Sequence, residues 1–181
     1  MKNALLLHGT FDNSQSNWLP WLKEQLENRG YKVWVPDLPG ADKPNLERYN
    51  KFIFSNWQFD VDSVLIGHSS GAVAILGILQ NLPSDVVVKK AILVAGFKDD
   101  LDWEPLKEIN FDFDWDKIKA RCKKIILIHS DDDPFVPVDQ GEFLKEKLGA
   151  EMRILKGQQH FSISTMGDGY FQFPPILELI G

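Results

Sequence analysis

The pentapeptide GHSSG at residues 67–71 is the segment whose residue types point most directly to chemistry. It fits the pattern G-x-S-x-G, in which a serine nucleophile stands on a tight turn between a strand and a helix. The apolar residues Val64–Ile66 before it favour a strand, and Ala72–Leu79 after it favour a buried helix. Glycine at each end removes side-chain bulk from a strained turn. Ser69 is therefore predicted to be a nucleophile, and a plain small-residue turn is the alternative.

A serine hydroxyl needs a base to remove its proton, and the chain offers four histidines. His8 ends the first predicted strand, and His68 adjoins Ser69 on the turn and cannot swing onto its hydroxyl. His129 ends another strand and precedes an acidic cluster. In this architecture the partners follow the chain order serine, acid, histidine, which only His160 satisfies. We expect His160 to be the base; a solvent-exposed loop histidine is the alternative.

The acid should follow a strand between the serine and the histidine. Three consecutive aspartates, Asp131, Asp132 and Asp133, stand in such a position. Asp133 precedes a proline that restrains the turn, so we predict that it orients the base and stabilises its protonated form. Asp131 and Asp132 remain open as alternatives, and Asp99 and Asp100, after the fourth predicted strand, are less suited ones.

Two backbone N–H groups should bind the negatively charged oxygen that forms during the reaction. The first belongs to Ser70, the residue after the nucleophile, and the second to the loop after the first strand. Within that loop we choose Thr10, with Phe11 as the second choice. The loop lacks the glycine, lysine and hydroxyl pattern of a P-loop and the G-x-G-x-x-G pattern, which disfavours nucleotide binding.

Short apolar runs and helix-like stretches must position these residues. The runs that favour strands are Ala4–Leu7, Val33–Val35, Val64–Ile66, Lys89–Val94, Ile125–Ile128 and Met152–Leu155. The stretches that favour helices are Trp18–Asn28, Gly71–Leu82, Val138–Leu148 and Pro174–Ile180. Continuous apolar strands that alternate with helices predict a parallel sheet buried on both faces, within a three-layer α/β/α sandwich.

Two connections, Asp37–Trp57 and Phe97–Lys119, are longer than the others, and we interpret them as walls of the site. Aromatic residues near the expected carboxyl ends of the strands suit an apolar substrate pocket. The residues predicted to bind substrate are Phe11, Trp57, Phe135 and Phe161. Three other aromatic residues in the second connection, Trp103, Phe111 and Trp115, are expected rather to pack onto the core.

The composition is that of an ordinary globular chain of one domain, residues 1–181, with 44% hydrophobic and 25% charged residues. A formal net charge of −6 disfavours nucleic acid or an anionic membrane surface as the partner. The single cysteine, Cys122, excludes an intramolecular disulfide. No apolar run has the length of a membrane span, and the expected location is the cytoplasm.

Beyond its motifs, the chain resembles the α/β-hydrolases, and most closely the compact serine hydrolases of the retinoblastoma-binding protein nine family. The resemblance rests on GHSSG, on FDWDKIK at residues 113–119, on DDPFVP at residues 132–137 and on GQQHF at residues 157–161. It implies a minimal six-stranded parallel sheet of order 2-1-3-4-5-6. We expect no cap domain, because 181 residues that supply six strands and their helices leave little chain for one. It also implies Ser69, Asp133 and His160 as the catalytic triad.

These observations predict a serine hydrolase that cleaves small carboxylic esters through an acyl-enzyme, with no metal or organic cofactor. An aminopeptidase or amidase with the same three residues is one alternative, with Asp12, Asp42 or Asp99 as candidates for holding an amine. A non-catalytic protein-binding module on a hydrolase scaffold is another. The expected partner is a small ester or amide; a protein partner stays open.

Overall fold

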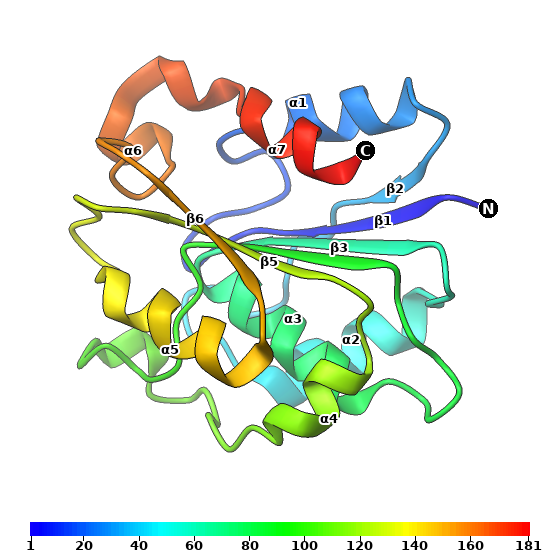
Figure 1. Ribbon diagram of the computed structural model, residues 1–181. Helices are drawn as coiled ribbons and strands as arrows, with labels where there is room; N and C mark the ends of the chain where they lie inside the picture. Colours follow the sequence, from blue (N-terminus) through cyan, green and yellow to red (C-terminus); the bar gives the residue numbers. More distant parts are fainter.

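The computed structural model describes residues Met1–Gly181, with one parallel β-sheet between two layers of helices (Figure 1). The strands are β1 (Asn3–Leu7), β2 (Lys32–Trp34), β3 (Ser63–His68), β4 (Lys90–Val94), β5 (Ile125–Ser130) and β6 (Glu151–Leu155). Their order is β2-β1-β3-β4-β5-β6, and all neighbours are parallel. The predicted sheet and its order are confirmed.

The helices divide between the two faces of the sheet. One face carries α1 (Leu19–Glu27), α6 (Ile163–Met166) and α7 (Pro174–Ile180) (Figure 1). The other carries α2 (Leu46–Asn56), α3 (Ser70–Asn81), α4 (Trp115–Ala120) and α5 (Val138–Leu148). Two 3₁₀ helices span Glu104–Leu106 and Gly167–Phe171. No helix combines the length and the apolar character needed to cross a membrane.

Burial on both faces explains why the central strands are continuous apolar runs. All residues of β1 and β3 are buried, and a single cluster of 50 buried hydrophobic residues joins the sheet to the helices. Helix α3 lies in the centre of one layer and is apolar on almost all sides. The carboxyl ends of the strands therefore stand on a rigid base, which fixes the loops that follow them.

The two long connections contain helices that the sequence analysis did not predict. Helix α2 begins at Asn45, whose side-chain oxygen accepts the Arg48 N–H at 3.0 Å, and it packs against α3. Helix α4 begins in the same way at Asp114, which accepts the Lys117 N–H at 3.0 Å. The interpretation of the whole Asp37–Trp57 connection as a wall of the site is therefore corrected, because no residue of it lines the cavity beside Ser69.

Candidate functional site

Ser69 is the single residue between β3 and α3, and its backbone angles are φ 56° and ψ −125°. These angles are strained for a residue with a side chain. A Cβ atom on Gly67 would lie 2.5 Å from the carbonyl of Gly71. One on Gly71 would lie 2.5 Å from the carbonyl oxygens of Leu7 and His8. Glycine at both positions thus lets α3 approach the strands closely enough to form the turn.

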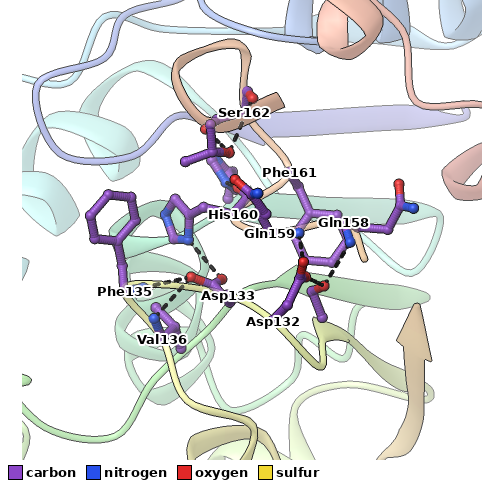
Figure 2. A network of polar contacts seen from close by, with 12 residues as sticks. Asp132, Asp133, Phe135, Val136, Gln158, Gln159, His160, Phe161 and Ser162 are labelled. Carbon is purple, nitrogen blue, oxygen red and sulfur yellow. Dashed lines mark hydrogen bonds and ion pairs between the residues drawn. The ribbon is translucent and has the colours of Figure 1, made fainter. Parts of the chain in front are cut away.

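A hydrogen bond joins His160 to Asp133 at the site (Figure 2). The Nδ1–H of His160 donates to Oδ2 of Asp133 at 2.8 Å, and the two side chains are only 11% and 1% exposed. Because an ionised carboxylate only accepts, the ring proton sits on Nδ1 and leaves Nε2 as a proton acceptor. Oδ1 of Asp133 accepts the N–H groups of Phe135 and Val136 at 2.8 and 3.0 Å, which fixes the carboxylate.

The neighbouring aspartates hold the histidine loop rather than the imidazole. Oδ1 of Asp131 accepts the Gly157 N–H at 2.8 Å. Oδ1 of Asp132 accepts the Gln159 N–H at 2.8 Å and the Ser130 hydroxyl at 2.6 Å. The hydrogen bonds from Ser130 and Gln159 hold the pKa of Asp132 below its usual range. Asp131 and Asp132, which lie in the loop after β5, therefore hold the backbone of the loop after β6 in place.

The more distant aspartates also have other partners. Asp99 forms an ion pair with Lys98 and accepts the Gln140 side-chain N–H at 3.1 Å. Asp100 accepts the N–H of Asp102 at 3.0 Å and so closes its own turn. Of the five aspartates weighed from the sequence, only Asp133 contacts His160.

The backbone on both sides of His160 is held from the centre of the molecule. The Nε2–H of His68 donates to the His160 carbonyl at 2.8 Å, and the indole N–H of Trp18 donates to the Phe161 carbonyl at 3.1 Å. Burial lowers the pKa of His68 to about 3, so this ring stays neutral. Gln159 and Phe161 both have positive φ, 43° and 54°. These contacts keep the strained loop, and with it the imidazole, in place.

The loop after β1 lines the same cavity as Ser69, and the backbone N–H groups of Thr10 and Phe11 differ in whether they are already bonded. The Phe11 N–H donates to the Ala41 carbonyl at 3.0 Å, so it is already used. The Thr10 N–H donates to no other atom of the chain. The Thr10 hydroxyl donates to Oγ of Ser70 at 2.9 Å and thereby ties this loop to the first residue of α3. The geometry supports Thr10 over Phe11 as the second donor.

His8 anchors the same loop, a role that the sequence analysis did not find. Its Nδ1–H donates to the Gly9 carbonyl and its Nε2 accepts the Leu38 N–H, both at 2.9 Å. Burial lowers the pKa of this imidazole below its usual value, which keeps one nitrogen a donor and the other an acceptor. The connections after β1 and β2 are thus joined behind the site.

Ser69 and His160 face one cavity of about 350 Å³. Phe11 and Phe135, both expected to bind substrate, line it, and the Phe135 ring stands edge-on to the His160 ring with centroids 5.1 Å apart. A larger cavity of about 630 Å³ lies against α2 and α3, but it contains none of the predicted site residues. The smaller cavity is therefore the candidate active site.

Two aromatic residues expected in the substrate site lie elsewhere. Trp57 follows α2 and stacks on Trp34, with ring centroids 5.6 Å apart and an interplanar angle of 17°. Phe161 is fully buried against Phe173 and Tyr170 and supports the loop from behind. Neither lines the cavity, so both expectations are corrected.

The connection after β4, expected to form a wall of the site, does line the cavity, through residues that were not singled out from the sequence as substrate-binding. Trp103, expected to pack onto the core, is 44% exposed and lines the cavity. Phe97, Leu101 and Leu106 line it too. Their position just after the carboxyl end of a central strand was the available signal.

Comparison with known proteins agrees with this architecture. The chain is 27% identical to the serine hydrolase RBBP9 of Rattus norvegicus over 158 residues, which cover 85% of this chain and 83% of that protein. The crystal structure of the ydeN gene product from Bacillus subtilis superposes with a TM-score of 0.91 at 27% identity, covering 99% and 97% of the two chains. Est1E from Butyrivibrio proteoclasticus, solved with ferulic acid, shares the fold at 16% identity and a TM-score of 0.71, covering 99% and 90%.

The family match covers nearly the whole chain. The serine hydrolase family aligns with residues 4–181, a span that includes the turn at Ser69 and the loop at His160. The resemblance inferred from the motifs is thereby confirmed. The chain belongs to the serine hydrolase family.

Proposed function

We propose that this chain hydrolyses small carboxylic esters through an acyl-enzyme formed on Ser69. The observation that carries the proposal is the buried hydrogen bond from His160 to Asp133. His160 lines the same cavity as Ser69, which lies in a strained turn. The bond leaves Nε2 of His160 as the acceptor that a serine hydroxyl requires.

In the proposed reaction, Nε2 of His160 takes the proton of Ser69 as its Oγ attacks the ester carbonyl. The N–H groups of Ser70 and Thr10 bind the oxyanion of the tetrahedral intermediate. His160 then donates the proton to the leaving alcohol, and Asp133 stabilises the imidazolium in between. Water, activated by the same nitrogen, hydrolyses the acyl-enzyme and frees the acid. The partner is a small molecule, and we place the reaction in the cytoplasm.

The test is hydrolysis of p-nitrophenyl acetate by the wild-type chain and by Ser69→Ala. We expect the variant to lose at least about a thousandfold in kcat, as is usual when a nucleophile is removed. Ser55→Ala is the matched control, because its hydroxyl bonds only within α2 and lies outside the cavity. Equal rates in Ser69→Ala and the wild type would assign the reaction to another nucleophile.

A second candidate function is cleavage of an aminoacyl amide, and one observation favours it. Asp12 lines the cavity, and a methyl group placed on Gly9 would touch both its carboxylate and Cβ of Ser69, at 3.5 and 3.1 Å. A carboxylate on the same cavity as Ser69 suits a substrate ammonium group. Asp12→Asn should then reduce turnover of alanine p-nitroanilide more than that of the acetyl ester. An equal effect on both substrates would remove this candidate.

A further inference from the structure

We infer that the cavity beside Ser69 is an acyl pocket for unbranched apolar acyl groups of up to about eight carbons, bounded by Leu106 at its floor and Trp103 at its mouth. This inference rests on the proposed function and specifies its substrate class. Three features carry it: the apolar floor, the aromatic mouth and the side on which the leaving group must stand.

The floor of the cavity is apolar and buried. Phe97 and Leu106, from the connection after β4, are each 1% exposed, and so is Val136 from the connection after β5. Leu101 lies half-buried beside them. None of these side chains offers a hydrogen bond, so this part of the cavity selects a group without polar atoms.

The mouth of the cavity carries a pair of exposed aromatic rings. Phe11 and Trp103 are 64% and 44% exposed, and their rings meet edge to face with centroids 5.8 Å apart. They come from connections after β1 and β4, so the pair bridges two loops that both border Ser69. A chain that extends outward from the floor would cover this apolar surface and gain by its burial.

The position of His160 decides which half of the ester occupies the floor. The leaving alcohol must stand beside Nε2 of His160, which protonates it. The Phe135 ring stands beside the imidazole in Figure 2. The loop that carries His160 and Ser162 leads to α6 on one face of the sheet. The connection that holds Leu106 leads to α4 on the opposite face (Figure 1). The alcohol therefore stands on the side of Ser162, and the acyl group on the side of Leu106.

The volume sets the length of the acyl group. At roughly 30 Å³ for a group the size of a water molecule, 350 Å³ holds about twelve non-hydrogen atoms. An octanoyl group has nine, which leaves the remaining space to the reacting end of the leaving group on the side of His160. Each buried methylene group is worth about fourfold in kcat/KM until the cavity is full.

The experiment compares p-nitrophenyl esters from acetate to dodecanoate, which share one leaving group, below their micelle concentrations. We expect kcat/KM to rise at least tenfold from acetate to hexanoate or octanoate and to fall beyond decanoate. Leu106→Phe, which enlarges the floor residue, should move the optimum to a shorter acid. Trp103→Ala should lower the ratio of octanoate to acetate turnover at least threefold and is exposed enough to leave folding intact. Phe171→Ala removes a similarly exposed aromatic ring outside the cavity and should leave the ratio unchanged.

The outcomes separate this inference from the proposed function. Turnover of acetate with a flat chain-length profile overturns the acyl pocket and leaves the esterase proposal standing. An unchanged ratio in Trp103→Ala, or an unchanged optimum in folded Leu106→Phe, overturns it as well. A folded wild-type chain without turnover of any ester contradicts the proposed function itself.

Discussion

At the scale of single residues, the Asp133 carboxylate has two tasks that fall to different oxygen atoms. Oδ1 closes the turn through the N–H groups of Phe135 and Val136, and Oδ2 holds the imidazole of His160. Asp132, one position earlier, points its carboxylate to the Gln159 N–H instead. Asp132 thus supports the loop, and Asp133 supports the imidazole of His160.

Asp133→Asn should reduce kcat for an acetyl ester by about 10²–10⁴-fold, because an amide that donates to Nδ1 favours the wrong tautomer. The fold should persist, since the amide oxygen can still accept the two turn N–H groups. Asp132→Asn is the matched control and should lose less than about tenfold, since its amide oxygen can still accept the Gln159 N–H. Steady-state kinetics decide this, and equal losses in the two variants would contradict the assignment.

His129 makes stability depend on pH. It is fully buried, neither ring nitrogen has a partner, and burial lowers its pKa from 6.5 to about 4. The unfolded chain therefore takes up a proton before the folded one does. The contribution of His129 to the free energy of unfolding is therefore fully present above pH 6.5 and is lost as the pH falls toward 4. His68, with its pKa lowered to about 3, adds to the loss in the same range.

His129→Leu should remove one part of this acid sensitivity. From the lowered pKa, we expect about 2 kcal/mol of the wild-type loss between pH 7 and pH 4.5 to be absent in the variant. Urea unfolding at the two pH values measures the difference. Parallel losses in the variant and the wild type would show that folding does not lower the pKa of His129.

At the scale of elements, the contact between β1 and α3 decides whether the turn at Ser69 can form. A side chain at Gly71 would strike the carbonyls of Leu7 and His8, whereas one at Gly77 in the same helix would meet the side chains of Leu46 and Asn50 no closer than 3.4 Å. Helix α3 can thus accept a methyl group at position 77 but not at position 71.

Gly71→Ala should lower the free energy of unfolding by about 2 kcal/mol or more and abolish activity, because β1 and α3 must separate. Gly77→Ala, the matched control, should be neutral or raise it by up to about 1 kcal/mol through helix propensity. Thermal unfolding of both variants checks the pair. A Gly71→Ala variant as stable and active as the wild type would show that this contact is not required.

The strands and the turn at Ser69 were predictable because their signals are local and strong. Helix α2 was missed because it buries only Leu46, Tyr49 and Ile53 within a polar sequence, although its cap at Asn45 was a usable signal. The missed helix also explains the error at Trp57. A crossover helix returns the chain to the amino ends of the strands, so the residue after it lies far from the site.

At the scale of the whole molecule, the sheet order brings together loops that are distant in sequence. The connections after β1, β3, β4, β5 and β6 all contribute to the site at the carboxyl edge. The acid was left open among neighbouring aspartates because their hydrogen bonds depend on how the loop after β6 crosses over β5. The order of strands in the sequence predicts which loops lie at the same edge of the sheet. Which side-chain atoms form hydrogen bonds there depends on how those loops pack.

The central claim is that Ser69 is a nucleophile activated by His160. Intact-mass spectrometry after brief treatment with a fluorophosphonate tests it directly, because the probe phosphonylates only an activated serine. We predict one adduct on the wild-type chain, mapped to Ser69 by peptide sequencing, no adduct on Ser69→Ala, and labelling at least a hundredfold slower on His160→Ala. A folded wild-type chain without an adduct at Ser69, or with equal labelling of His160→Ala, would contradict the claim and favour a binding protein on a hydrolase scaffold.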